Sequence, residues 1–173
     1  MPITSNNHGT KYLIIYASKH GSTEKCAKII SREIPGNCIT LPADKVKADD
    51  IDKAHHIALG SAIYAGMAMP VITKLCNKYK SQLLEKELSL FICGLSLSKT
   101  TQQKELNNAL PKEIRPNVNH KFFAGGEISL DKLSKKERLI LKLIKQDFNQ
   151  NTIDTEGLKQ FTKTILESKE PAQ

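Results

Sequence analysis

Apolar residues along this chain alternate between short continuous runs and longer stretches with helical spacing. The short runs are rich in β-branched and aromatic residues and end at glycine or hydroxyl-rich turns, which is typical of buried strands. Five segments fit this description: residues 11–17, 37–41, 55–59, 87–93 and 121–124. Apolar residues recur every three or four positions in the intervening segments, which predicts helices over 22–34, 71–79, 106–110 and 158–166.

Five strands that alternate with helices require crossover connections, and these make neighbouring strands parallel. The pattern therefore predicts an α/β domain with a doubly wound five-stranded parallel sheet, covered by helices on both faces. We expect residues 1–10 to be an N-terminal extension and residues 11–170 to form one domain. The long interval from Gly125 to Thr155 is unusual for a loop, so a helical insertion is expected at 127–152, before the last helix.

Within that interval, residues 133–148 predict a basic amphipathic helix. Leu139, Ile140 and Leu143 share a broad apolar face, and basic side chains gather on the opposite side. Two interpretations remain open. The helix either packs against the domain with a solvated lysine face, or it contacts an anionic membrane surface or a quinone.

Charge narrows the class of partner without naming it. The chain has 173 residues, with 26 basic and 18 acidic side chains and a formal net charge of +8. Such a surface favours nucleic acid, an anionic membrane or a small acidic substrate. Aromatic residues are only 5% of the chain and do not form the pattern of an RNA-binding sheet, so nucleic acid is not expected.

Other composition signals exclude several kinds of site. The four cysteines lack zinc-binding spacing and fall within apolar runs, so they are expected to be buried free thiols. His55 and His56 have no carboxylate or cysteine at ligand spacing, which favours a structural role and no metal site. No leader or membrane-spanning segment is evident, so we expect a cytoplasmic protein with at most peripheral membrane contact.

The turn after the first predicted strand carries the strongest chemical signal. It reads Ser18-Lys19-His20-Gly21-Ser22-Thr23 and leads directly into a helix. Hydroxyl groups, a glycine and the N–H groups of a helix start suit one phosphate monoester. The alternative is that Ser22 or Thr23 only caps the helix.

Two more loops leave strand ends at the same edge of the predicted sheet. Residues 60–66 combine small side chains with Tyr64, and residues 94–98 are again small and hydroxyl-bearing. Small residues allow backbone amides to reach a flat ring, which Tyr64 could flank. Each loop alone could be an ordinary strand-to-helix connection, but their joint placement favours a ligand site.

These motifs resemble the flavodoxin-like family. The resemblance rests on Ser18-x-x-Gly21-x-Thr23-Glu24 as a phosphate loop and on residues 60–66 and 94–98 as two isoalloxazine loops. It implies strand order 2-1-3-4-5 and an FMN cofactor, rather than FAD, at the point where strand order reverses. The implied FMN-binding residues are Ser18, Lys19, His20, Gly21, Ser22, Thr23, Ser61, Ala62, Ile63, Tyr64, Ala65, Gly66, Gly94, Leu95, Ser96 and Leu97.

Simple electron shuttles of this family are typically acidic, whereas this chain is basic. With its extra segment before the last helix, the chain most resembles the branch that contains menaquinone-dependent protoporphyrinogen IX dehydrogenase. This implies an FMN-dependent oxidoreductase that passes hydrogen equivalents from a substrate such as a porphyrinogen to a quinone or another acceptor. The alternative is an electron carrier that docks to protein partners. No side chain is assigned as a catalytic acid or base, because the flavin carries the electron chemistry.

Overall fold

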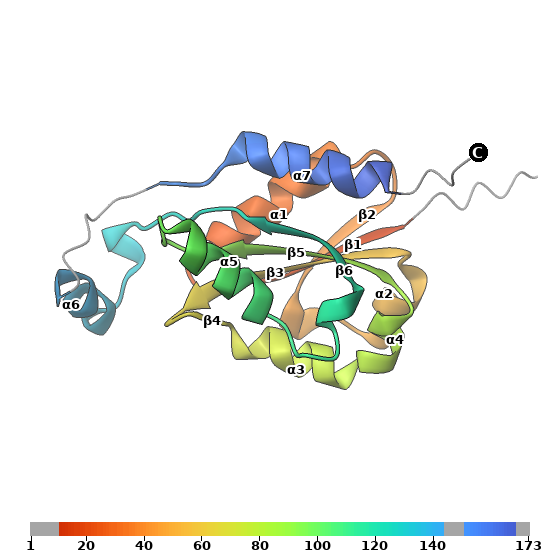
Figure 1. Cartoon of the computed structure of the whole chain (residues 1–173), viewed down its shortest axis with the longest axis horizontal. Coiled ribbons are helices and arrows are strands. Elements are labelled where there is room, and N and C mark those ends of the chain that lie inside the picture. The colour runs from red at the N-terminus through yellow and green to blue at the C-terminus, as the bar shows by residue number, and fades with distance from the viewer. Residues whose placement is uncertain (1–10, 144–150, 169–173) are drawn as a thin grey trace, which may run out of the picture.

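The computed structural model describes residues 11–143 and 151–168, in which helices cover both faces of a parallel sheet (Figure 1). The long strands pair in the order β2-β1-β3-β5-β6. Their bounds are Tyr12–Ala17 (β1), Cys38–Pro42 (β2), His56–Tyr64 (β3), Glu87–Cys93 (β5) and Val118–Phe123 (β6). Counted along the chain, this order is 2-1-3-4-5, so the predicted fold class and strand order are confirmed. All five carboxyl ends therefore meet at one edge of the sheet.

Helices divide between the two faces of the sheet. One face carries α1 (Ser22–Glu33) and α7 (Thr155–Glu167). The other face carries α2 (Ala48–Lys53), α3 (Pro70–Lys78), α4 (Lys80–Leu84) and α5 (Lys99–Asn108). Successive side chains of β1 point to opposite cores, with Ile14 against α1 and α7 and Ile15 against the other layer. Both are almost fully buried, so β1 lies at the centre of the domain.

The strand predicted at 55–59 continues further than the sequence pattern indicated. Its pairing with β5 continues from Gly60 opposite Phe91 to Ala62 opposite Cys93, so residues 60–64 of the loop expected at 60–66 are strand, and that part of the prediction was wrong. The chain then turns back through Ala65 and Gly66, both with positive φ, into the short antiparallel strand β4 (Met67–Ala68). Glycine is needed at position 60 inside β3, because a Cβ there would lie 2.1 Å from Cζ of Phe91.

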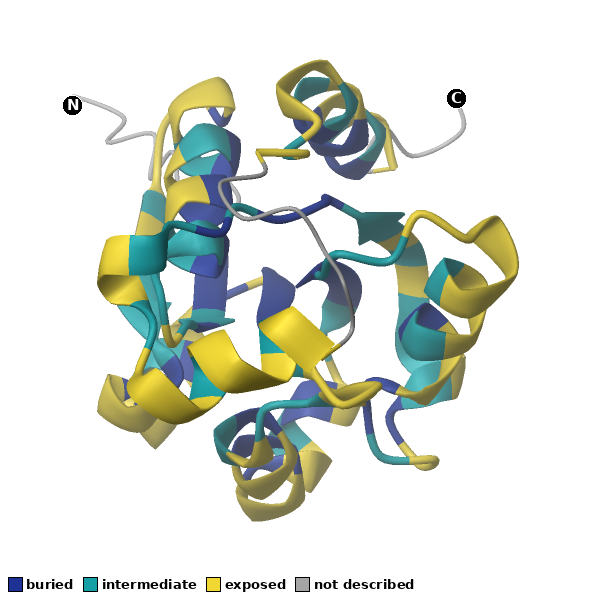
Figure 2. Cartoon of the chain, turned by 90° about the vertical axis from the view of Figure 1, so that its left-hand side faces the viewer, coloured by how far each residue is buried: buried dark blue, intermediate teal, exposed yellow. Residues whose placement is uncertain are grey.

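The segment between β6 and α7 contains a helix, as predicted for the insertion. A 3₁₀ turn at Leu130–Lys132 precedes α6 (Lys135–Leu143), which has no buried residue among those described. Leu139, Ile140 and Leu143 are 60%, 57% and 75% exposed, so this part of α6 does not join either core. Figure 2 views the molecule from the side on which α6 lies and shows the helix largely exposed. The rest of the predicted helix, residues 144–148, lies outside the described residues, as does the expected 1–10 extension.

Within the described ranges, no helix combines the length and the apolar character that crossing a bilayer requires.

Candidate functional site

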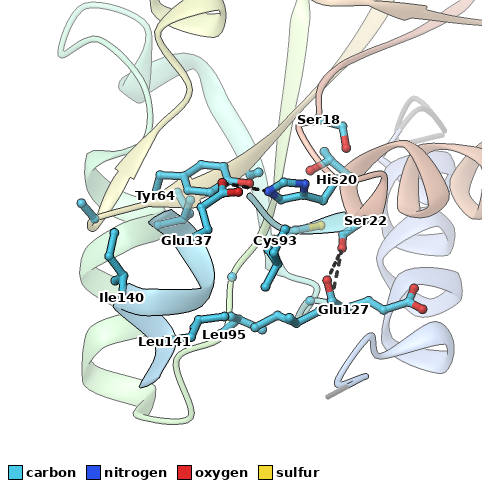
Figure 3. A pocket seen from close by; sticks show the side chains of 18 residues that line it. Ser18, His20, Ser22, Tyr64, Cys93, Leu95, Glu127, Glu137, Ile140 and Leu141 are labelled. Atoms are coloured by element: carbon cyan, nitrogen blue, oxygen red, sulfur yellow. Dashed lines mark hydrogen bonds and ion pairs between the residues drawn. The ribbon is translucent and has the colours of Figure 1, made fainter. Parts of the chain in front are cut away.

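A cavity of about 460 Å³ lies at the edge where the carboxyl ends of β1, β3 and β5 meet (Figure 3). The loop after β1, the end of β3 with its turn, and the loop after β5 form one part of its lining. Predicted site residues in this lining are Ser18, His20, Ser22, Thr23, Ala62, Ile63, Tyr64, Ala65, Gly94 and Leu95. Cys93 at the end of β5 and the segment between β6 and α7 contribute the rest. The structure therefore brings the three predicted sequences together, and the segment before α7 covers them.

The loop after β1 is shaped for an anion. Gly21 has a φ of 97°, a left-handed conformation that glycine adopts without steric cost. Its backbone N–H donates to Oγ of Ser18 at 2.9 Å, which closes the loop just before α1 begins. In the described part of the chain, no side chain caps the start of α1. The first N–H groups of the helix and its dipole are therefore available to a bound anion.

The two hydroxyl groups at the start of α1 have different roles. Ser22 Oγ donates to the carbonyl oxygen of Glu127 and accepts from the Glu127 N–H, both at 3.1 Å. Thr23 is fully buried, and its Oγ1 makes no hydrogen bond of normal geometry within residues 11–143 and 151–168, although it lies close enough to the Cys93 thiol to help lower the pKa of Cys93. The simple capping role left open by the sequence is therefore wrong for both residues. Thr23 offers a buried hydroxyl to a ligand.

A carboxylate from α6 reaches the same loop. Glu137 accepts a hydrogen bond from Nζ of Lys19, and its Oε1 lies 3.1 Å from Nε2 of His20. The Lys19 ammonium, with further help from the Ser134 N–H, lowers the pKa of Glu137 to about 2. Glu137 is therefore ionised at neutral pH and ties α6 to the loop after β1.

Tyr64 forms one side of the cavity beside this cluster (Figure 3). Its ring centroid lies 6.2 Å from that of His20, edge to face, and 5.3 Å from Nζ of Lys19. Burial, and to a smaller extent the charge of Glu137, raises the pKa of Tyr64 to about 12. The phenol therefore stays protonated, and Tyr64 can present an aromatic surface with a polar end.

The remaining walls of the cavity are apolar, and the segments that form them pack closely together. Ile63, Leu95 and Ile128 line the cavity from three different segments. The chain passes close to itself here, because a Cβ at Gly126 would lie 3.1 Å from the carbonyl oxygen of Gly94. Apolar walls of this kind suit a flat ring system, and the hydrogen-bonding groups at the other end suit a phosphate.

Several predicted site residues do not line the cavity: Lys19, Gly21, Ser61, Gly66, Ser96 and Leu97. Lys19 and Gly21 still shape the first loop, as described above. Ser61 is fully buried, and its hydroxyl accepts from the Met69 N–H and donates to the Ala62 carbonyl oxygen. It therefore links β3 to the residue between β4 and α3. Leu97 is 77% exposed.

Sequence reasoning missed part of the lining: Cys93, Gly126, Glu127, Ile128, Leu133, Glu137, Ile140 and Leu141. Two signals were present, since Cys93 ends a predicted strand and Gly125-Gly126 follows the last one. The α6 residues had no local signal, because their place over the cavity depends on tertiary contacts with Lys19 and His20.

The histidine pair at 55–56 makes ordinary polar contacts with its neighbours. No group of three His, Cys, Asp or Glu side chains in the described ranges is arranged to hold a metal ion. His56 is buried, with Nε2 at 2.7 Å from Oγ of Ser89, and Nδ1 of His55 accepts from the Lys11 N–H. Both contacts fit the structural role predicted for this pair.

Comparison with known sequences places most of the chain in one family. The family model Flavodoxin_5, described as a flavodoxin domain, matches residues 13–155. The uncharacterised protein MJ0298 of Methanocaldococcus jannaschii is 35% identical over 101 residues, which are 58% of this chain. That match spans 65% of the relative's length, just under two thirds.

Solved structures share the fold. Oxidised flavodoxin 1 from Bacillus cereus is 16% identical with a TM-score of 0.57, covering 91% of this chain and 98% of that one. A flavoprotein from Lactobacillus acidophilus in complex with FMN is 18% identical with a TM-score of 0.54, covering 66% and 93%. At these identities the likeness shows the fold alone. The matches support the flavodoxin-like resemblance but not its protoporphyrinogen dehydrogenase branch.

Proposed function

The chain belongs to the flavodoxin domain family, whose cofactor is FMN, and from this premise we propose that it carries electrons between protein partners with FMN held in the cavity. One observation carries the placement of the cofactor. An uncapped helix start with the buried Thr23 hydroxyl faces the same cavity as the apolar walls at Ile63 and Leu95. A phosphate and a flat ring are thus both provided for.

The residues around the first loop would hold the phosphate. Ser18, the first N–H groups of α1 and Thr23 supply neutral donors, and Gly21 allows close approach of the backbone. A cation also lies nearby, since Nζ of Lys132 is 3.8 Å from where a Cβ at Gly21 would be. These groups suffice for one phosphate, which favours FMN over FAD.

The walls of the cavity would orient the ring and exclude water from it. When bound, FMN supplies the transfer of one or two electrons. Ala62 and Ile63 at the end of β3 and Leu95 in the loop after β5 provide apolar contact, and Tyr64 can flank the ring. Leu141 and Ile140 of α6 border the same space, so α6 would limit access of solvent to the ring.

Identifying the cofactor by mass after release tests the proposal directly. We expect FMN, bound with one equivalent per chain, and a reduced protein that passes its electrons to acceptor proteins. Recovery of FAD, or a chain that binds no flavin on titration, would contradict it.

A second candidate is an FMN-dependent oxidoreductase that oxidises a flat substrate such as a porphyrinogen and reduces a quinone. The observation that favours it is the position of α6, whose Ile140 lines the cavity while Leu139, Leu143 and several basic side chains are exposed on the same helix. Such a surface suits a flat molecule that carries carboxylates, and it also suits contact of residues 133–148 with an anionic membrane. Sustained oxidation of protoporphyrinogen with a menaquinone would support this candidate. A single turnover without further consumption supports the carrier.

A further inference from the structure

Two buried thiols meet where α1 passes the carboxyl end of β5. Cys26 lies on α1 and Cys93 ends β5, and they are 0% and 3% exposed. Their Sγ atoms lie 3.5 Å apart in a thiol–thiol hydrogen bond, although 67 positions separate them in the sequence. Both are free cysteines. The electron-carrying role proposed above uses neither of them.

The two thiols differ in access and in acidity. Cys93 lines the cavity, whereas Cys26 is not among the described residues that line it (Figure 3). The hydrogen bond between the two thiols lowers the pKa of Cys93, with further help from the Thr23 hydroxyl, and the same bond raises the pKa of Cys26. A small oxidant that enters the cavity therefore meets Cys93 first, in the more readily ionised form, with a second thiol in contact behind it.

We propose that Cys93 and Cys26 form an oxidation site, at which a peroxide that enters through the cavity converts the pair into an intramolecular disulfide. In the first step the Cys93 sulfur attacks hydrogen peroxide, an S–O bond forms, the O–O bond breaks and one water leaves. In the second step the Cys26 sulfur attacks the sulfenic sulfur of Cys93, an S–S bond forms, the S–O bond breaks and a second water leaves. Both sulfurs are oxidised and the peroxide is reduced.

The disulfide would link the two elements that carry the cavity. Cys26 follows Thr23 by one turn of α1, and Cys93 directly precedes Gly94. The loops after β1 and β5 would then be joined at their base. A molecule that fills the cavity covers Cys93, so FMN should protect the pair, and this part rests on the proposed function.

The experiment treats the full chain with hydrogen peroxide, with and without FMN, then denatures it, alkylates the remaining thiols and determines masses. We expect the mass of two hydrogen atoms to be lost, two of the four cysteines to resist alkylation, and one cross-linked peptide to join Cys26 to Cys93. Saturating FMN should slow the reaction by at least about tenfold, because Cys93 is then covered.

Single serine variants assign the steps. Cys26→Ser should leave a sulfenic acid on Cys93 that dimedone traps, and Cys93→Ser should yield neither product. The matched control is Cys76→Ser, because Cys76 is equally buried and burial raises its pKa to about 12. This substitution should leave formation of the Cys26–Cys93 disulfide unchanged.

A disulfide that includes Cys38 or Cys76, or a fully alkylated chain after peroxide treatment, would overturn the proposal. If Cys26→Ser does not fold, the peptide map of the unaltered chain still shows whether Cys26 and Cys93 become cross-linked. Equal rates with and without FMN would leave the oxidation site standing and contradict the placement of FMN instead.

Discussion

Thr23 and Thr162 are both fully buried on helices that cover the same face of the sheet, but their hydroxyl groups differ. Oγ1 of Thr162 donates to the Leu158 carbonyl oxygen at 2.8 Å, whereas Oγ1 of Thr23 makes no hydrogen bond of normal geometry in the described structure and lies near the Cys93 thiol. A buried hydroxyl without a hydrogen bond destabilises the fold by about 1–3 kcal/mol. A threonine at position 23 is therefore better explained by a hydrogen bond to a bound ligand than by a contribution to the stability of the fold. The two explanations predict different effects of removing the hydroxyl.

Thr23→Val keeps the shape of the side chain and removes only the hydroxyl. We expect FMN to bind about tenfold to a hundredfold more weakly, as the loss of one hydrogen bond to a charged group implies. The free energy of unfolding of the FMN-free chain should stay unchanged or rise. Thr162→Val is the control, and should lower that free energy by about 1 kcal/mol while FMN affinity is retained. Unchanged FMN affinity in Thr23→Val would contradict the phosphate site.

Glu137 should make the attachment of α6 sensitive to acid. Its pKa in the folded chain is about 2, below its ordinary 4.5, chiefly because of Lys19. A carboxyl with a lowered pKa contributes stability in full above its ordinary value, and this contribution is lost as the pH falls toward the folded value. The free energy of unfolding should thus be higher for the native chain than for Glu137→Gln. The difference should be constant near neutral pH and vanish by about pH 2.

Urea unfolding at a series of pH values measures this difference. The contribution should be small, because Lys19 is half exposed and solvent screens the pair. Glu156→Gln, whose partner Lys159 is also on the surface, serves as the control. A difference between native chain and Glu137→Gln that persists unchanged at about pH 2 would show that the carboxylate does not hold α6.

At the scale of the elements, the sequence predicted the strands that continuous apolar runs mark. It missed the strand segments whose extent depends on pairing with a neighbouring strand. Five strands were evident because continuous apolar runs ended at turn residues. The extension of β3 to Tyr64 and the strand β4 were not, because Gly60, Ser61 and Ala62 resemble a loop until β5 pairs with them. The helix α2 was missed because ADDIDK has a single apolar anchor, Ile51, which is nevertheless fully buried.

The site shows the same division. The hydroxyl-rich sequence at 18–23 and the small-residue sequences at 60–66 and 94–98 are local patterns, and the parallel topology alone brings them to one edge of the sheet. The contribution of α6 depends on long-range contacts between Glu137 and the loop after β1. No local pattern encodes such a contact. The same holds for the approach of Cys26 to Cys93.

The exposure of α6 predicts a small effect of truncating its apolar side chains. Leu143 is 75% exposed, so Leu143→Ala should change the free energy of unfolding by less than about 0.5 kcal/mol. Leu158 of α7 is fully buried, and Leu158→Ala should lower that free energy by about 2–5 kcal/mol. Denaturant unfolding of both variants checks this. A large loss for Leu143→Ala would place α6 in the core.

At the scale of the whole molecule, the positive charge is unevenly distributed. Half of the net +8 comes from residues 121–146, which lead into and include α6. Lys135, Lys136 and Lys142 are exposed on this helix, beside the cavity. A charged surface around a redox site raises the rate of encounter with partners of opposite charge. The chain should therefore exchange electrons with acidic proteins in preference to basic ones.

The final prediction tests this preference with the FMN-loaded, reduced chain and two one-electron acceptor proteins, one acidic and one basic. The rate with the acidic acceptor should be the higher at low salt and should fall as salt is added, because the Debye length shrinks to about 8 Å at physiological ionic strength. Combined replacement of Lys135, Lys136 and Lys142 by Gln should lower that rate by about tenfold, since steering contributes about 10- to 1,000-fold. FMN affinity should not change, because none of these lysines lines the cavity.

The matched control replaces Lys78, Lys80 and Lys112, exposed lysines in segments leading to the amino ends of β5 and β6, and should leave the rate within about twofold. Equal losses in both triple variants would mean that net charge alone, and not the surface at α6, determines the partner.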